Sequence, residues 1–206
     1  GLTEMRRKYQ ATRTFPVGDF GEKEWREYRW AYFRMVETVD AKIGRLLDAI
    51  DARKDRDNTL VVFLSDHGDN QGAHRWNQKT TLYDESTRVP FLLRWPAVVR
   101  SGEDDALVNA GIDLMPTLCA AAGIEPPSGL FGCNLLTNEQ TDRPYVVTET
   151  AFAQGSGMNG DVIELEGRMI RSERYKYCVY DRGEQRESLV DMHRDPGETL
   201  NLARRP

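Results

Sequence analysis

The segment Ser65–Asp69 reads Ser-Asp-His-Gly-Asp and places two carboxylates and one imidazole within five residues. Carboxylate oxygens suit a hard cation such as Ca²⁺ or Mg²⁺, whereas an imidazole nitrogen favours a transition metal. Asp66 and His67 are therefore candidate metal ligands. The alternative is structural, because an aspartate at a strand end often caps the next turn while its neighbour packs against the fold. Spacing alone leaves both interpretations open.

Four more candidates follow in the same polar loop, namely His74, Arg75, Trp76 and Lys79. Two or three cations close to a metal site indicate an anionic substrate, because cationic side chains form charge-assisted hydrogen bonds with anionic oxygens. Each residue also has an ordinary explanation. A lysine before a helix is usually solvated, and a tryptophan in that position usually packs against the core.

A strand is expected immediately before this loop, over Thr59–Leu64. Its residues are β-branched or apolar on both faces, a pattern typical of a buried, parallel strand. In open α/β sheets, ligands bind at the carboxyl ends of such strands. A second apolar run, Val89–Trp95, is limited to a strand of modest length by Pro90 and Pro96. The candidate residues therefore lie where a ligand site is expected.

Helices are predicted on both sides of these strands. The first covers about Glu22–Arg53, and its apolar face is predicted to lie against a core; that face comprises Tyr32, Val36, Val39, Ile43, Leu46 and Ile50. A short helix is expected around Thr81–Ser86. Another covers Ile112–Ala122, with Gly123 just past its end as a stop signal.

The pattern changes after about Pro144. Short strand-like segments are separated by charged or glycine-containing turns; they are 145–148, 168–171, 175–180 and 187–192. This series predicts a small antiparallel sheet. The fold class is therefore α/β: residues 1–144 form part of a mainly parallel sheet flanked by helices, and residues 145–206 form a small C-terminal antiparallel-sheet subdomain.

Composition excludes several kinds of partner. With 28 basic and 33 acidic residues the net charge is −5, so there is no general attraction to nucleic acid or to an anionic membrane. No apolar run approaches the roughly 20 residues that a membrane span needs. Cys119, Cys133 and Cys178 are odd in number and form no C-x-x-C pair, so they are expected to be buried thiols rather than disulfides or zinc ligands.

Four stretches, in order and over nearly the whole chain, carry a resemblance to a known family. They are Val39–Arg45, the long run Asn58–Trp95 with its Ser-Asp-His-Gly-Asp and Arg-Val-Pro segments, Asp113–Leu118, and Asp195–Leu202. Together they resemble the sulfatase family of the alkaline-phosphatase superfamily.

The resemblance implies roles for the candidate residues. Asp66 and His67 would be ligands of a divalent cation, usually Ca²⁺ in this family, and Lys79 would contact the sulfate oxygens. His74 would touch the sulfate or protonate the departing alkoxide. Arg75 and Trp76 replace the more usual small residues of this loop, which suggests a local role in substrate choice. A cation and a lysine together would stabilise charge on the sulfate oxygens.

The family's nucleophile has no match in this sequence. Members of the family use a formylglycine made from a cysteine or serine near the amino-terminal end, together with two adjacent aspartates, and none of the three cysteines fits that motif. We therefore expect the carboxyl-terminal portion of a sulfatase, inactive alone, whose parent acts on a sulfated small molecule or sulfated glycan. The alternatives are a phosphonate or phosphodiester hydrolase of the same superfamily and a non-catalytic sulfatase-like protein.

Overall fold

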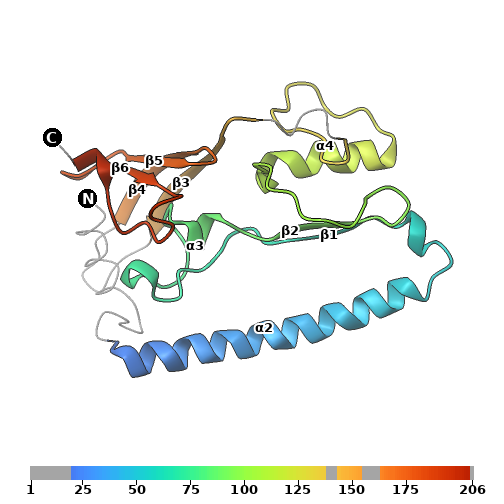
Figure 1. Cartoon of the computed structure of the whole chain (residues 1–206), viewed down its shortest axis with the longest axis horizontal. Helices are drawn as coiled ribbons and strands as arrows, with labels where there is room; N and C mark the ends of the chain where they lie inside the picture. Colours follow the sequence, from blue (N-terminus) through green and yellow to red (C-terminus); the bar gives the residue numbers. More distant parts are fainter. Residues whose placement is uncertain (1–19, 138–142, 155–162, 205–206) are drawn as a thin grey trace.

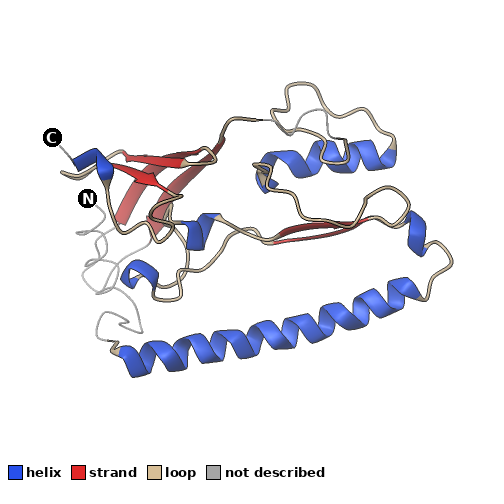
Figure 2. Cartoon of the chain, in the orientation of Figure 1, coloured by secondary structure: helices blue, strands red, loops and turns tan. Residues whose placement is uncertain are grey.

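The computed structural model describes residues 20–137, 143–154 and 163–204. Its elements are α2 (Glu22–Asp51), η2 (Arg56–Asn58), β1 (Val61–Leu64), η3 (Ala73–Arg75), α3 (Asp84–Thr87), β2 (Phe91–Arg94), α4 (Ala110–Ala122), β3 (Val146–Gln154), β4 (Ile163–Arg171), β5 (Tyr175–Tyr180), β6 (Glu187–Asp191) and η4 (Leu202–Arg204). In the view of Figure 1, α2 runs along one edge, β1 and β2 cross the middle, and β3–β6 gather at one end. Figure 2 marks the helices and strands.

The helix α2 forms over the predicted range, but its apolar face is only partly covered, since Tyr32, Ile43 and Ile50 are half-buried and the others are exposed. At its start the Glu24 carboxylate accepts a hydrogen bond from the Gly21 amide at 2.9 Å, which satisfies one free N–H group of the first turn. No residue of α2 is buried, and Val39 and Leu46 are 53% and 59% exposed. Among the described residues, the expected packing against a core is therefore incomplete. Periodicity shows which face is apolar but not what covers it.

The strand β1 pairs with β2 in antiparallel register, with Val61 opposite Arg94 and Leu64 opposite Phe91. The parallel pairing expected for Thr59–Leu64 is not seen among the described residues. The physical reason is that an apolar run on both faces indicates a strand covered from both sides, and this property does not depend on the direction of its neighbour. The faces are only partly covered here, since Leu92 of β2 is 56% exposed.

The predicted small antiparallel sheet is present. Its order is β3-β4-β5-β6, with each strand antiparallel to the next. The pairing of β3 with β4 extends from Val146–Arg171 to Gln154–Ile163, so both strands are longer than predicted. One added residue is Glu149, whose charge conceals strand character in the sequence but whose carboxylate forms a cross-strand ion pair with Arg168 at 2.8 Å.

The hydrophobic core lies between this sheet and the loop that follows β1. Side chains alternate between buried and exposed along β4 and β5, so one face of the sheet is turned inward. Its buried members are Leu165, Met169, Cys178 and Tyr180, and they pack with Trp76 and Leu82 of the loop. The sheet therefore supports the loop that carries the candidate residues.

The helix α4 is fastened by a buried carboxylate. Asp113 is fully buried, and its oxygens accept hydrogen bonds from the backbone amides of Asn109 at 2.7 Å and Cys133 at 2.9 Å and from the Arg143 guanidinium at 2.6 Å. Buried carboxylates need such partners. Cys119, Cys133 and Cys178 are free thiols, and the latter two are buried. Among the described helices, none is both long and apolar enough to cross a membrane.

Candidate active site

His67 is held by its neighbours in one tautomer. Its Nδ1 lies 2.8 Å from the Gly68 carbonyl oxygen, which can only accept, so Nδ1 carries the proton. Its Nε2 lies 2.7 Å from Nζ of Lys79, and an ammonium can only donate, so Nε2 presents a lone pair. The Oδ2 atom of Asp66 lies 3.5 Å from the same Nε2, on a side chain that is 84% exposed. Two potential metal ligands and one cation therefore converge just after β1.

Gly68 brings this turn into close contact with α3. Its amide donates to the Ser86 carbonyl at 2.8 Å. A Cβ at this position would lie only 1.9 Å from the carbonyl oxygen of Glu85, so no larger residue fits without moving the backbone. The short helix α3 therefore determines where His67 and Asp66 lie relative to the rest of the site.

A buried amide organises the loop beyond this point. Asn70 is 1% exposed, and its Nδ2 donates to the Gln78 carbonyl at 2.5 Å and to Oγ of Ser86 at 2.7 Å, while its Oδ1 accepts from Thr81 at 3.2 Å. Sequence reasoning missed this residue. A polar residue in a polar loop gives no sign of burial, and only its saturated hydrogen bonding shows that it supports the site.

The loop backbone is strained. Six non-glycine residues in the described part of the chain have positive φ, and five of them lie here, namely Gln71, His74, Arg75, Gln78 and Thr80. Such conformations cost about 1–3 kcal/mol each and tend to cluster at functional sites. The sixth is Glu198, near the carboxyl end.

His74 and Trp76 have mainly packing contacts. The imidazole of His74 stacks on the Tyr83 ring, with centroids 3.6 Å apart and planes 6° from parallel. Burial lowers the pKa of His74, while Glu85, whose Oε2 lies 3.7 Å from Nε2, opposes that shift. Trp76 is 2% exposed in the hydrophobic core, whereas Arg75 is exposed. The packing alternative considered for the tryptophan therefore describes its surroundings.

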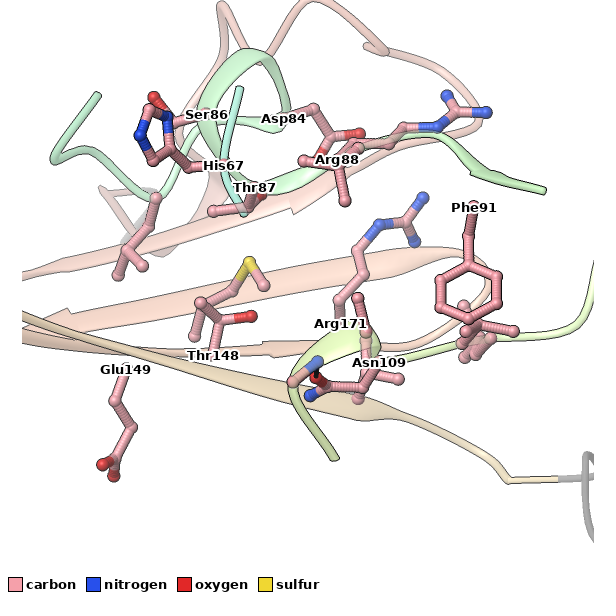
Figure 3. Close-up of a pocket in the computed structure, with 18 of the residues that line it drawn as sticks. His67, Asp84, Ser86, Thr87, Arg88, Phe91, Asn109, Thr148, Glu149 and Arg171 are labelled. Carbon is pink, nitrogen blue, oxygen red and sulfur yellow. Dashed lines mark hydrogen bonds between the residues drawn. The ribbon is translucent and has the colours of Figure 1, made fainter. Parts of the chain in front are cut away.

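A cavity of about 810 Å³ adjoins the end of β1. Asp66, His67 and Lys79 line it, whereas His74, Arg75 and Trp76 do not. Figure 3 shows His67 on one side of this space and Arg171 and Asn109 on another. The structure thus brings three of the six candidates together. No group of three or more His, Cys, Asp or Glu side chains able to hold a metal occurs in the described ranges.

Two family models match the sequence. The model described as Sulfatase covers residues 4–124, and the model described as N-sulphoglucosamine sulphohydrolase, C-terminal covers residues 72–206. Each match extends over more than half of the chain. The chain belongs to the sulfatase family. The resemblance carried by the sequence motifs is thereby confirmed.

Relatives and solved structures agree with this assignment. The chain is 34% identical over 195 residues to delta 4,5-hexuronate-2-O-sulfatase of Bacteroides thetaiotaomicron, covering 91% of this chain and 39% of that protein. It superimposes on the structure of a 2-O GAG sulfatase with a TM-score of 0.82 at 33% identity, covering 98% of this chain and 44% of the other. It superimposes on the phosphonate monoester hydrolase of Agrobacterium radiobacter with a TM-score of 0.74 at 26% identity, covering 90% of this chain and 40% of the other. This sulfatase-family chain therefore spans about two fifths of the length of these proteins.

Proposed function

We propose that the protein to which this chain belongs hydrolyses sulfate esters, and that Asp66, His67 and Lys79 form part of its active site. The observation that carries the proposal is the convergence of these three side chains in the lining of one cavity, in a chain of the sulfatase family. A sulfate ester is an anion, and a site that combines a cation with a lysine suits its non-bridging oxygens.

Asp66 and His67 fit a divalent cation as two of its ligands. The carboxylate of Asp66 is open to solvent. The Nδ1–H group of His67 donates to the Gly68 carbonyl, which leaves the lone pair of Nε2 for coordination of a metal ion. We propose Ca²⁺, with its other ligands supplied by the rest of the full-length protein. A bound cation would polarise the sulfate oxygens. Lys79 would then donate to these oxygens instead of to His67.

His74 has less support as the proton donor to the leaving alkoxide. Its ring is stacked on Tyr83 and does not line the cavity, and its lowered pKa disfavours the protonated form that an acid needs. For Arg75 and Trp76 we retain a role in substrate choice only through the shape of the loop, because Trp76 is buried and neither residue lines the cavity.

The nucleophile is proposed to be a formylglycine in the rest of the full-length protein. The same part of the protein would complete a mainly parallel sheet around the β1–β2 pair, within a larger unit that includes residues 1–144, while residues 145–206 form the C-terminal subdomain. The exposed faces of α2 and β2 support this arrangement, because a central sheet and its flanking helix normally bury such surfaces.

The proposed substrate is a sulfated glycan fragment. The name of the hexuronate sulfatase and the description of the GAG sulfatase structure support this class of compound. The second candidate function is phosphonate monoester hydrolysis, which the structural similarity to the Agrobacterium enzyme favours. A protein that keeps the fold without a nucleophile is the third.

Assays of the full-length protein distinguish these functions. We expect hydrolysis of an aryl sulfate and of a 2-O-sulfated unsaturated uronic acid, at rates well above those for an aryl phosphonate monoester. Lys79→Ala should lower kcat by about a hundredfold or more, as loss of one charge-stabilising donor commonly does. Lys54→Ala, at an exposed lysine in the turn after α2 and outside the cavity lining, is the matched control and should leave kcat unchanged. Preference for the phosphonate ester, or full activity in the Lys79 variant, would contradict the proposal.

A further inference from the structure

Three charged side chains meet at the start of α3, where the side chains of Lys176, Glu198 and Asp84 are 0%, 4% and 22% exposed. Lys176 of β5 is fully buried, and its Nζ lies 2.7 Å from Oδ1 of Asp84 and 2.9 Å from Oε1 of Glu198. The other oxygen of Glu198 accepts a hydrogen bond from the Asp84 amide at 2.7 Å. The cluster therefore joins the start of α3, the C-terminal sheet and the turn near the carboxyl end.

Burial of these charges has an unfavourable desolvation free energy. Removing two carboxylates and an ammonium from water costs several kcal/mol per ion, and apolar residues of similar volume often serve stability equally well. Burial raises the pKa of Glu198, although Lys176 opposes that shift. A function besides stability would explain why charges occupy this position.

The backbone conformation of Glu198 also indicates a function besides stability. Its φ is +51°, in the left-handed region that costs a residue with a Cβ about 1–2 kcal/mol. The turn is held by Asp195, whose carboxylate accepts hydrogen bonds from the Thr199 hydroxyl at 2.9 Å and from the Leu200 amide at 2.7 Å. The chain thus accepts local strain at the residue that directs a carboxylate under α3.

The cluster reaches the candidate site through α3. Asp84 is the first residue of this four-residue helix, and two residues later Ser86 accepts the Gly68 amide and contacts Asn70. Gly68 is in turn adjacent to His67. A shift at Asp84 would therefore move the backbone against which His67 and the loop leading to Lys79 are held.

We propose that Glu198 and Lys176 are positioning residues, which hold α3 so that Asp66, His67 and Lys79 keep the geometry the reaction requires. This proposal rests on the proposed function for its effect on catalysis. Its structural content is the coupling of Glu198, near the carboxyl end of the chain, to Gly68 at the site.

The test uses Glu198→Gln in the full-length protein. The amide keeps the size of the side chain and an oxygen for the Asp84 amide, but it removes the charge that pairs with Lys176. The control is Arg174→Met, which breaks the 2.8 Å ion pair between the turn before β5 and Asp191 at the end of β6. Five quantities are measured in each variant: kcat, KM, the Kd for Ca²⁺ by calorimetry, the melting temperature, and amide hydrogen exchange in peptides spanning residues 65–70.

We expect Glu198→Gln to lower kcat at least tenfold with KM within about threefold, to weaken Ca²⁺ binding at least fivefold, and to speed exchange in residues 65–70. The control should change the melting temperature alone. If Glu198→Gln does not fold, Glu198→Asp tests the same coupling in another way, because it keeps the charge but withdraws the carboxylate by one methylene from Lys176 and the Asp84 amide; the same changes are expected. A Glu198 variant that lowers only the melting temperature would overturn the proposal. If the wild type does not hydrolyse sulfate esters, the proposed function fails, while the exchange and Ca²⁺ measurements still decide the coupling.

Discussion

At the scale of single residues, the hydrogen bonds of His67 determine what the site can bind. With Nδ1–H directed at the Gly68 carbonyl, Nε2 is left for a cation, and the nearby Asp66 carboxylate supplies negative charge. The Lys79 ammonium takes that position at 2.7 Å. The same two ligands are too few for tight binding on their own, because a Ca²⁺ ion takes six to eight oxygen ligands.

This ligand count gives a prediction for the cation. The 206-residue chain alone should bind Ca²⁺ with a Kd on the order of millimolar or weaker. In the full-length protein, Asp66→Ala should raise the Kd by at least the roughly 10–100-fold that loss of a supporting partner costs. Calorimetry measures both values. Asp105→Ala removes another exposed carboxylate of the same cavity and should have little effect. Equal losses in the two variants would argue against a specific site at Asp66.

A second prediction at this scale concerns pH. Burial lowers the pKa of His74 below its ordinary value of 6.5, so the unfolded chain takes up a proton near pH 6.5 that the folded chain resists. The stability of the fold should therefore be highest above pH 6.5 and should fall as the pH drops below that value. In His74→Phe, which keeps a ring to stack on Tyr83, the loss of melting temperature between about pH 7.5 and 5.5 should be smaller. His193→Phe, at a more exposed histidine, is the control, and it should lose as much melting temperature over this pH range as the wild type does.

The sequence revealed the residues that carry charge at the site but not those that support it. Asp66, His67 and Lys79 belong to a recognisable motif, and all three line the cavity. Trp76 departs from the usual motif and so suggested a role toward substrate. In a sequence, however, a tryptophan that packs in a core cannot be distinguished from one that contacts a substrate. Asn70 was missed because burial of an amide depends on partners as far away as Ser86, 16 residues along the chain.

At the scale of elements, α3 connects the parts of the site although it has only four residues. It receives the Gly68 amide on one side and the Lys176 cluster on another, and Glu85 faces His74. A short helix contributes little stability by itself. Its position therefore depends on these contacts. The contact at Gly68 leaves no room for a Cβ atom.

Gly68→Ala should disturb this contact. The added Cβ would lie 1.9 Å from the Glu85 carbonyl oxygen, so the backbone must move, and overpacking of this kind costs about 1–3 kcal/mol. The melting temperature and the sulfatase activity of the full-length variant should both fall. Gly44→Ala is the matched control, because nothing lies within 4 Å of a Cβ there and alanine is favoured within a helix by about 0.5–1 kcal/mol. A Gly68 variant as stable and active as the wild type would show that α3 adapts freely.

The sequence predicted which segments are helices and strands better than it predicted how the strands pair. The 3.6-residue period located α2 to within two residues of its end, and the four C-terminal strands were recognised by their turns. The apolar run predicts a parallel neighbour for β1, whereas β2, its neighbour among the described residues, is antiparallel. Pairing direction depends on which strands meet in three dimensions, and local apolar runs carry no information on that choice.

At the scale of the whole molecule, apolar side chains are exposed on three separate elements. Those on α2, β2 and α4 that exceed half exposure are Trp30, Phe33, Met35, Val39, Leu46, Leu92 and Met115. Patches of this kind mark surfaces that meet another part of a protein or promote association. Because the chain spans 39% of its hexuronate sulfatase relative, we expect the rest of the parent protein to cover them.

Leu46 allows this expectation to be tested in two contexts. The 206-residue chain alone should bind a hydrophobic dye and self-associate, and Leu46→Lys should reduce both effects, because it removes apolar surface from α2. In the full-length protein the same variant should instead lower the melting temperature, since it would place an unpaired charge in a covered surface. Asp48→Lys, on an exposed position of the same helix, should do neither. Dye fluorescence, sedimentation and thermal unfolding provide the measurements. If Leu46→Lys is as stable as the wild type in the full-length protein, this face of α2 stays open to solvent there, and the surface that covers it must be sought in another molecule.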